Sequence, residues 1–157
     1  MAMTSNSLKI IPLGGLGAIG KNMMALEFGP DIVIIDAPCS SIGTIRRNPE
    51  IFYRHSSPNF QYITSIQYKF LNKAKNLVKN NGIIIYMVCS FLNNEGNNQI
   101  ERFLNENKNF SLVKFFSKNR DINELINEKG FFKTYPINFR NKFLIDGFFA
   151  AQLQKNA

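Results

Sequence analysis

The sequence has few of the residues that bind metal ions or serve as catalytic bases. It contains one histidine, two cysteines and no tryptophan among 157 residues. A zinc site needs about three or four closely spaced His, Cys or carboxylate ligands, and this composition does not supply them. The histidine, His55, lies in a polar stretch, which favours a loop position over membership of a Ser-His-Asp triad.

Long hydrophobic runs and acidic residues are also scarce. No run reaches the roughly 18 residues of a membrane-spanning helix, and residues 1–7 lack the pattern of a signal peptide. Lys and Arg number 19 against 11 Asp and Glu, a net charge of +8. This surplus predicts a polyanionic partner, with nucleic acid as the first candidate. We expect a cytoplasmic protein with two free thiols.

Hydrophobic residues are plentiful enough for one folded domain, at 45% of the chain with 15 Phe and 5 Tyr. Their patterns predict an α/β fold with a mixed sheet. The expected strands are residues 8–13, 21–28, 31–36, 83–88 and 110–116, and the expected helices are 60–79 and 94–107. Two aromatic-rich strands, 130–137 and 143–153, are expected to form an antiparallel hairpin at the sheet edge.

The first helix is predicted to be amphipathic and to connect two buried parallel strands. Its apolar positions recur every three or four residues and are expected to face the core. They are Ile63, Ile66, Phe70, Ala74, Leu77 and Val78.

Both cysteines follow buried strands. Asp36 and Cys39 come after strand 31–36, and Cys89 comes directly after strand 83–88. Because ligands of open α/β sheets bind outside the carboxyl ends of the strands, two thiols and a carboxylate are expected to share one crevice. The alternative is that each cysteine is a small buried hydrophobe.

Four ordered motifs resemble those of the RsmB/Sun type of RNA (cytosine-5) methyltransferases. Residues 36–50 are similar to that family's DAPCSGxGTxRRxP stretch, and residues 82–90 to its GGxLVYxTCS strand. Residues 94–100 resemble its PEENExxI helix start, and residues 146–151 its DGFF(Y)A strand. The order and spacing agree from Asp36 to about Lys155, which implies an incomplete Rossmann-like methyltransferase fold.

The resemblance implies covalent methyl transfer from S-adenosylmethionine to carbon 5 of a cytosine in RNA, with rRNA as the expected substrate. Cys89 corresponds to the cysteine that attacks carbon 6, and Cys39 to the cysteine that assists release of the product. Asp36 corresponds to a carboxylate between cofactor and target base. Arg46 and Arg47 correspond to paired arginines that would contact RNA phosphate, although a solvated surface pair is the alternative.

The chain also departs from that family's pattern. Val88 stands where the family usually has Thr, and Ser41 where it usually has Gly. The family's glycine-rich DxCAAPGGKT loop, which holds the cofactor, has no counterpart before Asp36. We therefore expect weak or absent methyl transfer, and the alternative is a non-catalytic RNA-binding or inert fragment.

The first part of the chain resembles a different family. Residues 8–36 are similar to the opening strands of ribonuclease J, although one histidine cannot supply that family's two-metal site. Residues 15–20 also fit the GxGxxG dinucleotide pattern, which is a weak signal here because a helix of useful length does not follow.

The two resemblances predict that the chain divides into residues 1–35 and a partial methyltransferase domain, 36–157. The division indicates a fused or recombined reading frame, or an artefact of sequence assembly. Self-association through an uncovered sheet edge is a further expectation.

Overall fold

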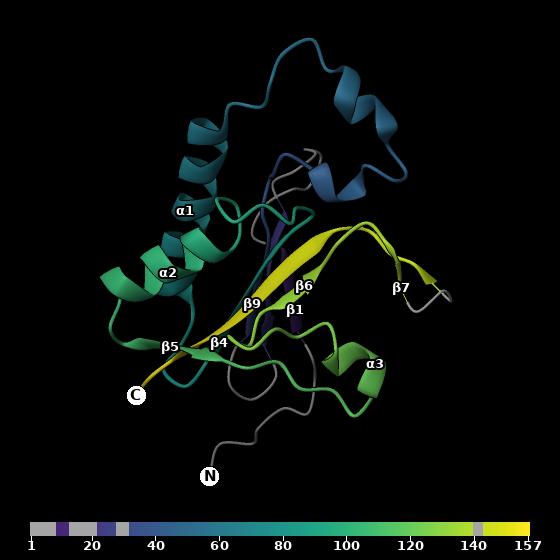
Figure 1. The fold of residues 1–157 in the computed structure, drawn as a ribbon. Coiled ribbons are helices and arrows are strands. Elements are labelled where there is room, and N and C mark those ends of the chain that lie inside the picture. The colour runs from purple at the N-terminus through teal and green to yellow at the C-terminus, as the bar shows by residue number, and fades with distance from the viewer. Residues whose placement is uncertain (1–8, 13–21, 28–31, 140–142) are drawn as a thin grey trace.

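The computed structural model describes residues 9–12, 22–27, 32–139 and 143–157 (Figure 1). Within these ranges a seven-stranded mixed sheet has the order β1-β2-β3-β4-β9-β5, with β6 also pairing with β9. The strands are β1 Lys9–Pro12, β2 Asn22–Glu27, β3 Ile32–Asp36, β4 Ile83–Val88, β5 Phe110–Val113, β6 Phe132–Thr134 and β9 Phe148–Lys155. A separate pair consists of β7 Asn138–Phe139 and β8 Phe143–Leu144.

The helices connect these strands. They are α1 Phe60–Leu77, α2 Asn97–Glu106 and the short α3 Arg120–Asn123, with two 3₁₀ helices, η1 Ile42–Thr44 and η2 Pro49–Tyr53. α1 and α2 contact each other, α1 contacts β3 and β4, and α2 contacts β5. The two longer helices therefore lie together on one side of the sheet (Figure 1).

The two strands expected at the centre of the sheet are confirmed. β3 and β4 pair in parallel, with Ile32 opposite Ile83 and Asp36 opposite Met87. Their buried residues alternate along each strand, because successive side chains of a strand point to opposite faces. α1 follows β3 and precedes β4, as a parallel crossover requires.

The face that α1 buries agrees with the predicted one in part, since Ala74 and Val78 are buried and Phe70 packs against the core. Its buried residues are Gln67, Tyr68, Leu71 and Ala74. In contrast, Ile63 and Ile66 are only half-buried, and Leu77 is 49% exposed. Gln67 is buried as well, and its amide donates to the backbone carbonyl of Pro38 at 3.0 Å. The spacing of apolar residues cannot predict that a polar side chain is buried by a tertiary hydrogen bond of this kind.

The predicted antiparallel hairpin is confirmed, because β6 pairs antiparallel with β9 and β7 with β8, but the predicted place of its second strand at the sheet edge is wrong. β9 lies inside the sheet, where it pairs antiparallel with β4 on one side and with β5 and β6 on the other. Its residues Phe149, Ala151 and Leu153 are fully buried in the core. A strand that pairs on both sides and buries this much apolar surface is stabilised more at the centre of a sheet than at its edge.

The first strands continue the same sheet. β1 pairs antiparallel with β2, and β2 pairs antiparallel with β3. β1 is the outermost strand of the described part, and Ile10 is 62% exposed there. The GxGxxG stretch, residues 15–20, lies outside the described residues. The division at residue 36 and self-association through this edge stay predictions.

Candidate active site

The carboxyl ends of β3 and β4 are joined by backbone hydrogen bonds. Ala37 N donates to Met87 O at 3.0 Å, and Gly43 N donates to Cys89 O at 3.0 Å. Gly147 N in turn donates to Gly43 O at 2.7 Å. A Cβ at Gly43 would lie 1.8 Å from Gly147 O, so this approach of three segments requires glycine. The loops after both strands are thus packed tightly against each other at the carboxyl ends of β3 and β4.

The structure brings the two cysteines together at this edge. Both are half-buried free thiols, and each shifts the pKa of the other through a side-chain hydrogen bond. This hydrogen bond is the main cause that lowers the pKa of Cys89 to about 7, and the charge of Arg47 acts in the same direction. Burial and the charges of Asp36 and Asp146 oppose it. Cys89 is therefore the group that forms a thiolate near neutral pH.

Cys39 has the opposite behaviour. Its hydrogen bond to Cys89, followed by burial, raises the pKa of the Cys39 thiol far above its usual range. The charge of Glu95 acts in the same direction, whereas a backbone hydrogen bond at Ser41 opposes it. Cys39 therefore keeps its proton and donates the hydrogen bond to Cys89. The pair therefore consists of one thiol that ionises near neutral pH and one that keeps its proton.

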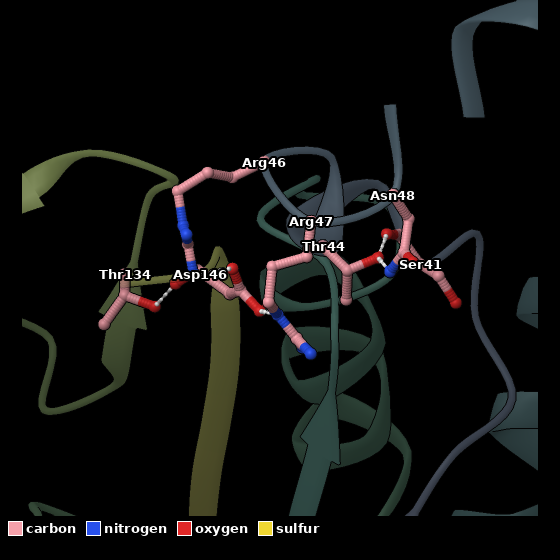
Figure 2. Close-up of polar contacts among 7 residues, drawn as sticks. All are labelled: Ser41, Thr44, Arg46, Arg47, Asn48, Thr134 and Asp146. Carbon is pink, nitrogen blue, oxygen red and sulfur yellow. Dashed lines mark hydrogen bonds and ion pairs between the residues drawn. The ribbon is translucent and has the colours of Figure 1, made fainter. Parts of the chain in front are cut away.

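The two arginines nominated from the sequence share one carboxylate (Figure 2). Asp146 lies 3.2 Å from Arg46 Nη2 through Oδ1 and 2.5 Å from Arg47 Nε through Oδ2. The Asp146 carbonyl accepts a hydrogen bond from Thr134 Oγ1 at 2.7 Å. Arg47 remains 59% exposed, so part of its guanidinium faces solvent. Sequence reasoning missed this role of Asp146, although its motif was recognised.

The turn that carries the arginines is stabilised within itself (Figure 2). Thr44 Oγ1 donates to Ser41 O at 2.9 Å and accepts from Asn48 Nδ2 at 2.9 Å. Ser41 has φ 60°, a left-handed conformation that glycine adopts most easily. This conformation gives a physical reason for the family's usual glycine at the position.

A buried carboxylate that sequence reasoning did not nominate lies behind the cysteines. Glu95 is fully buried and accepts hydrogen bonds from Ser40 and Ser90, the residues that follow the two cysteines. The available signal was an acidic residue inside the recognised 94–100 motif.

Asp36 lies at the carboxyl end of β3, and its charge acts on Cys89. A half-buried carboxylate in this place can accept hydrogen bonds from the amino or hydroxyl groups of S-adenosylmethionine, so it fits one end of that cofactor. His55 is exposed. The part of the chain that the structure describes contains no group of three or more metal-ligating side chains and no helix able to span a membrane.

Similarity to known proteins agrees with this geometry. The model of the 16S rRNA methyltransferase RsmB/F family matches residues 18–154. The ribosomal RNA small subunit methyltransferase B of Pasteurella multocida is 37% identical over 83 residues, which cover 53% of this chain and 18% of that protein. A probable methyltransferase B of Synechocystis sp. is 30% identical over 127 residues, which cover 80% of this chain and 27% of that protein.

Solved structures show the same fold. The crystal structure of PH0851 has a TM-score of 0.67 and 32% sequence identity, and the match covers 79% of this chain and 26% of the PH0851 chain. A methyltransferase homologue from Pyrococcus horikoshii has a TM-score of 0.56 at 23% identity, over 79% of this chain and 38% of its own. The fold is therefore the Rossmann-like α/β fold with a mixed sheet that methyltransferases use.

The chain belongs to the 16S rRNA methyltransferase RsmB/F family. It spans between about a fifth and about a quarter of the length of the two curated relatives. The family match begins at residue 18, inside the segment that resembled ribonuclease J. That nuclease resemblance finds no support in these comparisons.

Proposed function

We propose that the chain carries the cysteine chemistry of a cytosine-5 rRNA methyltransferase. The observation that supports this most is the thiol pair, because Cys89 is tuned toward a thiolate by a neighbouring thiol that keeps its proton. An enzyme that adds a sulfur nucleophile to a base needs a thiolate at neutral pH.

The proposed reaction starts at carbon 6 of the cytosine. The Cys89 thiolate forms a bond to carbon 6, and the electron pair of the 5,6 double bond makes carbon 5 nucleophilic. After methylation, the proton on carbon 5 passes to solvent water, and its C–H electron pair re-forms the double bond. The carbon–sulfur bond then breaks, and its electron pair returns to Cys89 as the thiolate. Cys39 assists this release, and its S–H stabilises the charge on the departing sulfur.

S-adenosylmethionine, when bound, would supply the methyl group. Asp36 would hold one polar end of it beside Cys89. Arg46 and Arg47 would place RNA phosphate at the edge of the site, since each keeps exposed guanidinium surface while Asp146 orients both. The Rossmann-like fold and the family support this cofactor.

A second function is RNA binding without methyl transfer. The net charge of +8 favours it, because charge alone supports binding to RNA phosphate. It applies if these 157 residues lack the cofactor contacts of the longer relatives. Calorimetric titration with S-adenosylmethionine separates the two functions, because saturable heat requires a cofactor site.

The decisive test is a covalent adduct with an rRNA fragment that contains cytosine, in the presence of S-adenosylmethionine at about pH 8.5. We expect Cys39→Ala to accumulate adduct, because release is impaired, and Cys89→Ala to form none. Denaturing gels and mass spectrometry measure the adduct. The double variant is the matched control, and adduct in it, or in Cys89→Ala, would contradict the assignment.

A further inference from the structure

Glu95 is a buried carboxylate whose two oxygens are both occupied. Oε1 accepts from Ser40 N at 2.7 Å and from Gln67 Nε2 at 3.3 Å. Oε2 accepts from Ser40 Oγ at 2.6 Å and from Ser90 Oγ at 2.6 Å. A carboxylate removed from water is tolerated when hydrogen bonds of this kind replace its hydration.

The donors come from three segments that are far apart in the sequence. Ser40 follows Cys39 after β3, Ser90 follows Cys89 after β4, and Gln67 belongs to α1. Glu95 itself lies just before α2, where Tyr86 Oη donates to its backbone carbonyl at 2.7 Å. One side chain thus connects the two cysteine-bearing loops to each other and to the helices behind them.

We propose that Glu95 is a positioning residue that holds the Cys39 and Cys89 loops in register and so fixes the positions of the two thiols relative to each other. The inference rests on the proposed roles of the two cysteines. Each serine is one peptide bond from its cysteine, so a shift at either serine moves the corresponding sulfur. Short hydrogen bonds to a charged acceptor are stronger than neutral ones and restrict such shifts.

The charge of Glu95 has a second effect, because it increases the difference in pKa between the two thiols. It raises the pKa of Cys39, which helps this thiol to keep its proton. The other charged groups that act on the pair are Asp36 from β3, Arg47 from the η1 turn and Asp146 from the segment before β9. Besides its charge, Glu95 contributes contacts with both loops, since it accepts hydrogen bonds from both Ser40 and Ser90.

Glu95→Gln is the informative change, because an amide cannot satisfy the same donors. Ser40 Oγ already accepts from Ile42 N at 3.4 Å, and Ser90 Oγ accepts from Leu92 N at 3.2 Å. If the new NH₂ group replaces Oε2, both hydroxyl hydrogens lose their acceptor. The buried hydroxyls must then find other partners, which loosens both loops.

The test measures alkylation of each cysteine by iodoacetamide between pH 5 and pH 10, with peptide mass spectrometry on the full chain. For Glu95→Gln we expect the midpoint for Cys89 to rise by about one pH unit, because the hydrogen bond from Cys39 is weakened. We also expect the ratio of Cys89 to Cys39 alkylation near pH 7 to fall about tenfold. Glu101→Gln is the matched control, since it removes an exposed carboxylate that pairs with Lys129, and it leaves both quantities unchanged.

A folded Glu95→Gln protein with the original midpoint and ratio would overturn the proposal, even if it melts at a lower temperature. Ser90→Ala keeps the charge of Glu95 and removes its link to the Cys89 loop, together with the hydrogen bond from Leu92 N to Ser90 Oγ. It should raise the Cys89 midpoint as well, and an unchanged midpoint would overturn the proposal if Glu95→Gln does not fold. Because alkylation needs neither RNA nor cofactor, failure of methyl transfer leaves this test intact.

Discussion

At the residue scale, the two thiols are chemically identical, but their pKa values are shifted in opposite directions. Each lies within a few residues of the end of a parallel strand, and each is half-buried. The difference comes from the direction of one hydrogen bond and from the neighbouring charges. Arg47 favours the thiolate of Cys89, whereas Glu95 opposes ionisation of Cys39. The difference in pKa between Cys89 and Cys39 therefore comes mainly from their electrostatic surroundings, since burial raises the pKa of both thiols.

This difference predicts the effect of Cys39→Ala on the reactivity of Cys89. The midpoint of Cys89 alkylation should lie near pH 7 in the unmodified chain, with the rate rising as the pH passes through that value. Loss of the Cys39 hydrogen bond should raise the midpoint by about one pH unit or more toward that of an ordinary thiol. Stopped-flow alkylation across pH measures it. Ser65→Ala, an exposed change on α1, should keep the midpoint near 7, and the same result for Cys39→Ala would refute the hydrogen-bond explanation.

At the element scale, β9 is the strand that connects β5 and β6 to the rest of the sheet. It pairs with β4, β5 and β6, which makes it the strand with the most partners among those described. The Phe149 ring packs against Phe131, with ring centroids 5.2 Å apart, and against Tyr86 at 6.4 Å. The segment that leads into β9 carries Asp146, so the packing of this strand also places the partner of both arginines.

Phe149→Ala should therefore destabilise the whole domain. Removing a fully buried phenylalanine ring should cost about 3–5 kcal/mol in the free energy of unfolding, from lost burial and the cavity left behind. Phe116→Ala is the matched control, because that ring is 82% exposed and its loss should change stability by about 0.5 kcal/mol or less. Urea denaturation measures both. Equal losses for the two variants would contradict the position of β9 in the core.

At the scale of the whole molecule, the charge surplus favours a polyanionic partner. A net charge of +8 would attract the proposed RNA over distances of about a Debye length, and contacts with phosphate would make the affinity depend on salt. Arg46 and Arg47 share only one carboxylate, so the cluster keeps a positive charge beside Cys89. This location would bring RNA phosphate to the reactive thiol.

The combined change Arg46→Gln and Arg47→Gln should reduce the salt dependence of RNA binding. Each phosphate contact that is lost should lower the slope of log affinity against log salt by about 0.7 for single-stranded RNA. Fluorescence anisotropy at several salt concentrations measures it. Lys108→Gln with Lys129→Gln removes the same charge from exposed positions away from the cysteines and should change the slope less. A larger change for the lysine pair would place the RNA contact elsewhere.

Much of this architecture follows from local patterns in the sequence. The bounds of β4 were predicted to the residue, and those of β3 and α1 to within two residues, because continuous β-branched runs and helical periodicity are local properties. The recognised motifs placed both cysteines at the carboxyl ends of neighbouring strands. The sequence by itself thus determined the α/β class, the family and the candidate nucleophiles.

Only the tertiary structure decided the rest. Four features join residues that are distant along the chain. They are the place of β9 inside the sheet, the hydrogen bond from Gln67 to Pro38, the pairing of both arginines with Asp146 and the contacts of Glu95. Such contacts depend on which faces meet after the chain collapses, and hydrophobic periodicity carries no information about their partners. The two thiols acquire different reactivities for the same reason, since their hydrogen bond exists only when the ends of β3 and β4 are side by side.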